Sequence, residues 1–344
     1  MIDGVKDGIV SNPPACRFDP ATVQCNAQGQ ADCLSPEAVQ AVRDIYAGAH
    51  DDKGTKLVIG GPQPGSELSW EGVFVPRSAD GPIMSKSAAS DMLRSLVYWR
   101  PLPADWDLSQ FKYTTETLEG LMPAHGLYDA TDPDLSPFAG RGGKLLMWHG
   151  WSDPHISPLN SVAYYQAVSD TVGEKARQDF LRLYLIPGLY HCGGGDALTS
   201  VDVLTPLVRW VEGGGAPESL VASRTDADAA AGKGRTRYPF PATSALRSGA
   251  DPELPASWQP GPPALVPAKL YKAWAGAKLF EPGYEKECGF ESPNFACRPA
   301  RRPPARRRPT SLIGSQFGRL THRGLVLSEA THPCISPESS TTRP

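Results

Sequence analysis

The sequence predicts an α/β protein whose second half carries a parallel β-sheet covered by helices. Two observations predict this fold class. Between residues 142 and 215 an apolar strand, a loop and a helix follow one another, and the same order is then repeated. The composition agrees, because 40% hydrophobic residues can build a core, while 34 Gly and 35 Pro among 344 residues indicate many loops.

The first part of the chain predicts helices and irregular loops. Residues 35–47 should form a helix, since Ser35 can cap its start, a proline follows, and apolar residues recur at helical spacing. Residues 85–98 predict a second helix, and residues 99–111 an aromatic loop. Strands and helices do not alternate here, so we interpret the chain before about residue 142 as an irregular insertion.

The chain after about residue 142 contains the predicted sheet. Residues 144–148 and 180–186 are short apolar runs, as buried parallel strands are. Residues 157–170 and 200–212 follow them as helices, and the second helix should stop at three consecutive glycines. We find no internal repeat.

Two polar loops follow the two predicted strands. Asp153 lies in the first loop and His191 in the second. Loops at the carboxyl ends of parallel strands meet at one edge of a sheet, so an oxygen of Asp153 should lie within about 3.5 Å of a ring nitrogen of His191. Taken singly, Asp153 could cap the next helix and His191 could be a loop histidine. Together, in this order, they predict the acid and histidine of an α/β-hydrolase triad. His149 and His155, in the first loop, are interpreted as pocket or structural residues.

The serine of such a triad is missing. It normally stands in the motif G-x-S-x-G, on a sharp turn between a strand and a helix. No serine of this chain has glycine at both positions, and the nearest, Ser152, fails at Pro154. The chain therefore cannot form a complete triad by itself.

Several segments resemble successive blocks of the tannase/feruloyl esterase family: DGVKDGIVSNPPACRFDP, ADCLSPEAV, GPQPGSELSW, ATDPDLSPFAGRGGKLLMWHGWSDPHISP and LYHCGGG. The resemblance implies a serine esterase that cleaves small phenolic-acid esters and is secreted or periplasmic. It also implies a partial α/β-hydrolase core over residues 127–297, preceded by a lid over residues 1–126. The N-terminal half of the hydrolase, with the serine, would be missing from this chain.

Four of the seven cysteines predict local disulfides. Cys25 and Cys33 are separated by a polar loop, and Cys288 and Cys297 bracket a short aromatic turn. Local disulfides indicate an oxidising compartment.

The other cysteines, Cys16, Cys192 and Cys334, are expected to remain thiols. The resemblance implies that the partners of Cys16 and Cys192 lie upstream of Met1. We expect these two cysteines to lie too far apart to pair with each other.

A calcium site is implied by the start of the chain. Asp3 and Asp7 would supply carboxylates, and Val5 and Ile9 backbone carbonyls. By spacing alone, an acidic surface turn is the more common outcome. The resemblance favours structural calcium, although the site would be incomplete because one family aspartate is absent from this chain.

Residues 298–344 predict a disordered tail. They hold nine Arg and two Glu, and this surplus of seven positive charges stands out against a net charge of -3 for the whole chain. We interpret the tail as solvated and possibly non-native rather than as a nucleic-acid-binding segment. No apolar stretch predicts a membrane span, and the N-terminus lacks the pattern of a signal peptide.

The predicted function is therefore carboxylic ester hydrolysis by a Ser-His-Asp mechanism, with the serine absent from this chain. Two alternatives stay open. The chain could be a catalytically inactive truncated fragment, or it could be a calcium-binding or interaction module.

Overall fold

A computed structural model describes residues 5–26, 32–98, 101–122, 125–191, 193–284, 288–291 and 294–297, of which 126–127, 288–291 and 294–297 are described by their backbone only. Asp3, Cys192 and the tail from residue 298 lie outside these ranges.

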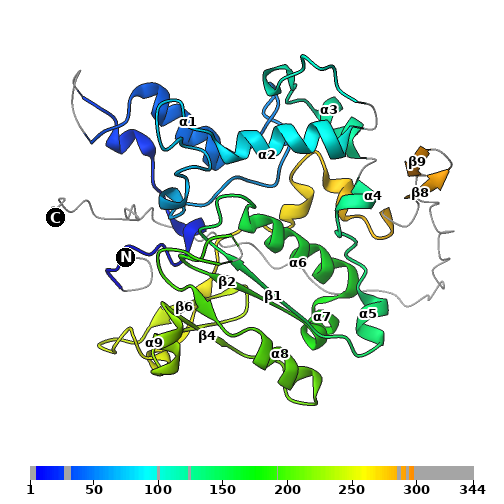
Figure 1. The fold of residues 1–344 in the computed structure, drawn as a ribbon. Coiled ribbons are helices and arrows are strands. Elements are labelled where there is room, and N and C mark those ends of the chain that lie inside the picture. Colours follow the sequence, from blue (N-terminus) through cyan, green and yellow to red (C-terminus); the bar gives the residue numbers. More distant parts are fainter. Residues whose placement is uncertain are drawn as a thin grey trace, which may run out of the picture.

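The N-terminal part consists of helices joined by loops (Figure 1). Its helices are α1 (Pro36–Ala47), α2 (Met84–Met92) with the π-helical turn Leu93–Val97, α3 (Thr115–Leu121) and α4 (His125–Tyr128), and its 3-10 turns are Pro13–Ala15, Pro20–Val23, Glu67–Ser69 and Leu108–Gln110. The two predicted helices are confirmed. Ser35 caps α1, because its hydroxyl accepts the backbone N–H of Ala38 at 3.2 Å.

A two-stranded parallel sheet forms the core of the second part. Strand β1 (Leu145–Gly150) pairs in register with β2 (Leu181–Ile186), so that Leu145 lies opposite Leu181 and Gly150 opposite Ile186. Helix α5 (Ser136–Gly140) precedes β1, and helices α6 (Pro158–Val172) and α7 (Glu174–Phe180) connect the strands. Both predicted strands and the helix between them are confirmed.

Each face of this sheet carries a buried apolar cluster, as expected of a parallel sheet between two layers, although Trp148 of β1 is 45% exposed. On one face, Leu181 and Leu183 pack with Val162 and Val168 of α6. The opposite face carries a second apolar cluster that includes Leu146, Tyr184 and Ile186 of the strands, together with Leu220 and Ala222 of β4 (Leu220–Ser223). The continuous apolar runs of the strands are explained by this two-sided burial.

The chain after β2 differs from the prediction. The predicted helix at residues 200–212 is too long: Ser200–Val201 form strand β3, which pairs with β4, and the helix α8 covers only Leu204–Val211. The carboxylate of Asp202 starts α8, since its Oδ1 accepts the N–H groups of Leu204 and Thr205 at 3.1 and 3.0 Å. The remaining elements, absent from the prediction, are α9 (Asp226–Ala230), β5 (Arg235–Arg237), β6 (Ala242–Leu246), β7 (Trp258–Pro263), β8 (Cys288–Glu291), β9 (Asn294–Cys297) and 3-10 turns at Pro255–Ser257, Leu270–Lys272 and Ala277–Phe280.

The two outer edges of the β1–β2 sheet differ. The backbone N–H of Phe240 donates to the carbonyl of Leu183 at 2.8 Å and thereby covers part of the outer edge of β2. No strand among the described residues pairs with the outer edge of β1. The fold class is thus a partial α/β-hydrolase core with a helical and irregular region before it. The helices in the described part of the chain are all too short or too polar to cross a membrane.

Candidate active site

The loops that follow β1 and β2 touch each other directly. A Cβ atom on Gly150, the last residue of β1, would lie 2.0 Å from the carbonyl oxygen of Leu189, so only glycine allows this approach. The backbone N–H of Ser152 then donates to the same carbonyl at 3.2 Å. This close contact brings together the loop after β1, which carries Asp153 (the acid loop), and the loop after β2, which carries His191 (the histidine loop).

Asp153 and His191 meet at this contact. Oδ2 of Asp153 lies 2.9 Å from Nδ1 of His191. Oδ1 accepts the backbone N–H groups of His155 and Ile156 at 2.8 and 3.0 Å. The Asp153 side chain is only 3% exposed, whereas that of His191 is 46% exposed. The predicted contact is therefore present, with the acid buried and the histidine open to solvent.

The carboxyl group of Asp153 is held in its charged form. Burial raises its pKa, but hydrogen bonds from His149, Ile156, His191 and His155 outweigh burial and hold the pKa at about 2. An ionised carboxylate only accepts hydrogen bonds, so the proton of the shared bond must be on Nδ1 of His191. The other ring nitrogen, Nε2, is then unprotonated in the neutral imidazole and can act as a base.

Two further histidines, His149 in strand β1 and His155 in the loop that follows it, surround this pair. Nε2 of His149 lies 3.1 Å from Oδ2 of Asp153, the same oxygen that contacts His191. The ring of His155 lies 5.1 Å from that of His191, edge to face. Burial, reinforced by His191, lowers the pKa of His155 against the opposing effect of Asp153. The sequence located both histidines near the site, but it gave no sign of the contact between His149 and the acid.

Hydrogen bonds attach the acid loop to the N-terminal part of the chain. The hydroxyl of Ser152 donates to the carbonyl of Gly65 at 2.9 Å, and that of Ser157 to the carbonyl of Gly61 at 2.8 Å. The hydroxyl of Ser69 reaches the carbonyl of Ser152 at 3.3 Å. These bonds hold the N-terminal part of the chain against the loop that carries Asp153.

A groove of about 670 Å³ opens beside the acid loop, between it and the N-terminal part of the chain. Phe74, Tyr113, His155 and Ile156 contribute to its lining. Its volume lies within the range of small-molecule sites, which is about 300 to 1,000 Å³.

The aromatic residues of the N-terminal part have different positions. Trp70 and Trp106 are core residues, 4% and 8% exposed, whereas Phe74 reaches the groove. Trp99 lies outside the described residues. Tyr113 also lines the groove, and nothing in its local sequence marks it as a pocket residue.

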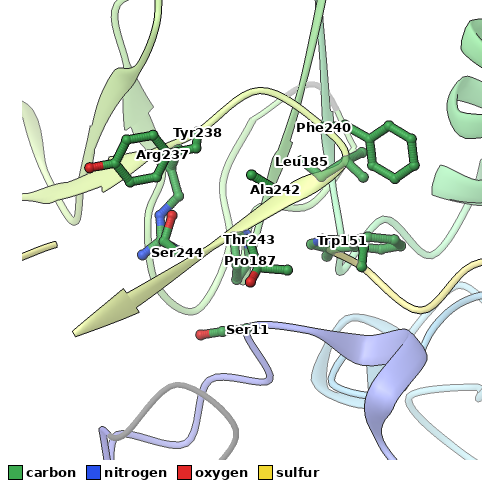
Figure 2. Close-up of a pocket in the computed structure, with 11 residues that line it drawn as sticks. Ser11, Trp151, Leu185, Pro187, Arg237, Tyr238, Phe240, Ala242, Thr243 and Ser244 are labelled. Atoms are coloured by element: carbon green, nitrogen blue, oxygen red, sulfur yellow. The ribbon is translucent and has the colours of Figure 1, made fainter. Parts of the chain in front are cut away.

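A second cavity, between the N-terminal segment and strands β2 and β6, is too small for a substrate. Figure 2 shows it bounded by Ser11, Trp151, Thr243 and Arg237, and its volume is about 20 Å³. Such a volume holds about one water molecule.

The described part of the implied calcium motif is engaged in other bonds. Oδ2 of Asp7 lies 2.5 Å from Nη1 of the buried Arg235, and Oδ1 accepts the N–H of Ile9 at 3.0 Å. A guanidinium at this distance supplies the positive charge that a cation would bring, so Asp7 does not fit a calcium site in this arrangement. The described residues contain no cluster of three or more His, Cys, Asp or Glu side chains suited to a metal. Asp3 lies outside the described residues, so the ligand set with Val5 and Ile9 carbonyls stays a prediction.

The cysteines agree with the prediction in part. Cys25 and Cys33 form a disulfide. The backbones of Cys288 and Cys297 lie opposite each other in the β8–β9 pair, but their side chains are outside the described residues.

The prediction of a free Cys16 thiol is wrong, since Cys16 is disulfide-bonded. The expected separation of Cys16 and Cys192 stays a prediction, because Cys192 lies outside the described residues.

Comparison with known proteins agrees with this geometry. The family model described as "Tannase and feruloyl esterase" matches residues 1–254. The chain belongs to this family.

Among curated relatives, mono(2-hydroxyethyl) terephthalate hydrolase of Piscinibacter sakaiensis is 33% identical over 256 residues, and the match covers 64% of this chain and 42% of that protein. A probable feruloyl esterase B-2 of Aspergillus terreus is 32% identical over 237 residues, and the match covers 64% of this chain and 43% of that protein.

Solved structures of family members share the fold. An esterase from Aspergillus oryzae superposes with a TM-score of 0.64 at 27% identity, covering 75% of this chain and 53% of that one. Tannin acyl hydrolase from Aspergillus niger gives a TM-score of 0.54 at 21% identity, covering 79% and 52%, and supports the fold alone. The chain thus spans about half the length of the relatives that it matches.

Proposed function

We propose that this chain carries the acid and histidine of a Ser-His-Asp carboxylic ester hydrolase that acts on phenolic-acid esters. The observation that supports it most is the 2.9 Å contact between the buried Asp153 carboxylate and Nδ1 of the exposed His191. In this mechanism Nε2 of His191 takes the proton of a serine hydroxyl as the serine attacks the ester carbonyl. His191 then returns the proton to the leaving alcohol, and Asp153 stabilises the imidazolium that forms between the two steps.

The serine would come from outside these 344 residues, because no G-x-S-x-G motif occurs in them. We propose that the segment bearing it adds a parallel strand to the outer edge of β1. The described residues leave that edge without a partner strand, and a two-stranded sheet is marginal by itself. A cavity of about 360 Å³ with Met147, Tyr164 and Phe280 in its lining lies beside this strand and offers apolar surface for the same segment.

The phenolic part of the substrate would bind in the groove of about 670 Å³. Phe74 and Tyr113 offer aromatic surface there, and His155 connects the groove to His191. The names of the relatives, which include feruloyl esterases and a terephthalate monoester hydrolase, agree with an aromatic acyl group.

A secreted or periplasmic location is part of the same proposal. The Cys25–Cys33 disulfide supports it, since disulfides persist in oxidising compartments.

The test is reconstitution. The chain is expressed alone, and then together with the part of the Piscinibacter sakaiensis relative that lies outside the match, with methyl ferulate as substrate. We expect no saturable hydrolysis by either half alone, and activity from the pair that is lost on His191→Ala and on Asp153→Asn. Activity of the pair that survives His191→Ala would refute the proposed roles.

A catalytically silent fragment is the second candidate, and the missing G-x-S-x-G motif favours it. This candidate predicts that the two halves neither copurify nor hydrolyse the ester, although each is folded. A calcium-binding module, the remaining alternative, receives no support from Asp7, whose carboxylate pairs with Arg235.

A further inference from the structure

The carboxylate of Asp153 has a second imidazole partner besides His191. Nε2 of His149 lies 3.1 Å from Oδ2 of Asp153, and Nδ1 of His191 lies 2.9 Å from the same oxygen. The side chain of His149 is 13% exposed, against 46% for His191. The two histidines therefore flank one carboxylate oxygen, one of them largely buried and the other open to solvent.

The surroundings of His149 determine which of its nitrogens carries the proton. Besides Asp153, Nε2 faces the carbonyl oxygen of Ile156 at 3.1 Å. Both of these oxygens only accept hydrogen bonds, so Nε2 must be protonated. Nδ1 lies 2.7 Å from the hydroxyl of Ser161, which can donate to it. The neutral Nε2–H tautomer satisfies all three contacts.

We infer that His149 is a positioning residue for the Asp153–His191 pair. Ser161, on helix α6, orients the ring of His149, and His149 in turn holds Oδ2 of Asp153 in the direction of His191. The backbone N–H groups of His155 and Ile156 hold the other oxygen. Four donors then fix the carboxylate, and His149 is the only side-chain donor among the described residues besides His191 itself.

This arrangement also affects the electrostatic interaction between Asp153 and His191. The N–H group of His149 donates to Oδ2 and so weakens the attraction of that oxygen for the imidazole of His191. His149 should therefore moderate the strength with which Asp153 binds the imidazole of His191. A residue that only fills space at this position would have no such effect. The inference rests on the proposed function for its relevance to catalysis, but its test does not involve ester hydrolysis.

The first experiment determines the tautomer of His149 by long-range proton–nitrogen NMR correlation in the full chain. We expect the Nε2–H form at neutral pH in the wild type. Ser161→Ala should weaken this preference, because Nδ1 loses its hydroxyl partner. A wild-type Nδ1–H form would overturn the inference.

The second experiment follows the titration of the Asp153 carboxyl group by carbon NMR in three variants. His149→Leu removes the donor and should raise the pKa of Asp153 from about 2 by roughly one unit. His149→Gln retains an N–H donor and should restore part of the wild-type value. His155→Gln is the matched control, because it removes an imidazole 5.1 Å from His191 but leaves the backbone bond of residue 155 to Asp153.

The outcomes separate positioning from packing. An unchanged Asp153 titration in folded His149→Leu protein would overturn the inference, and so would an equal change in His155→Gln. If His149→Leu does not fold, His149→Gln and Ser161→Ala decide the question. Failure of ester hydrolysis in the reconstituted enzyme would affect the proposed function but not these measurements.

Discussion

Replacement of Asp153 by asparagine should change how the stability of the protein depends on pH. The pKa of the Asp153 carboxyl group is lowered from 3.8 to about 2, and the side chain is only 3% exposed. At about 1.4 kcal/mol per pKa unit, this difference corresponds to about 2 kcal/mol of folding free energy. Because the pKa is lower in the folded state, this contribution is fully present above the pKa of the unfolded chain and is lost as pH falls through the folded value.

The measurement is urea unfolding of wild-type and Asp153→Asn protein at a series of pH values between about 7 and 2. We expect the wild type to be the more stable at neutral pH. The stability gap should then shrink by about 2 kcal/mol between about pH 4 and pH 2. A gap that stays constant across this range would refute the conclusion that hydrogen bonds from His149, His191 and two backbone amides stabilise the ionised form.

Two further predictions concern close contacts elsewhere in the chain. Gly150→Ala should destabilise the protein by about 3 kcal/mol in thermal unfolding, because the new Cβ would lie 2.0 Å from the backbone oxygen of Leu189. Gly120→Ala is the control: there is free space around its new Cβ, so this substitution should be neutral or stabilising. Asp7→Asn should cost about 3 kcal/mol in urea unfolding with a chelator present, because Arg235 is 2% exposed and loses the nearer of its two ion-pair partners, keeping Glu253 at 3.8 Å. A loss seen only when calcium is added would instead assign the Asp7 carboxylate to a cation.

The sequence by itself was sufficient to predict the strands that precede Asp153 and His191. The runs at residues 144–148 and 180–186 are apolar except for Lys144 and Arg182, and this pattern arises because both faces of a parallel sheet are largely buried. Since parallel strands end at the same edge of a sheet, the order of Asp153 and His191 was enough to predict their contact. The start of α1 could also be predicted from the local sequence, because the hydroxyl of Ser35 caps the helix that begins at the next residue.

Other features depended on residues that are distant in the sequence. The local sequence predicts that Ser200 and Val201 belong to a helix, but in the structure they form a strand. They pair with Ser223 and Ala222, and these tertiary hydrogen bonds override the local preference. The β-strands after α8 are short and polar in part, and no periodic pattern marked them.

In the candidate active site, too, some features follow from the sequence and others only from the tertiary structure. The sequence placed His149 in the acid loop, but only the tertiary structure brought its Nε2 to the oxygen that His191 also contacts. Likewise, the sequence placed Asp7 in an acidic turn, but only the fold brought the buried guanidinium of Arg235 beside its carboxylate. A sequence records which residue types are present and how strands and helices alternate, whereas the partner of a buried charge is decided by packing between distant segments, because a charge without a nearby partner is costly to bury.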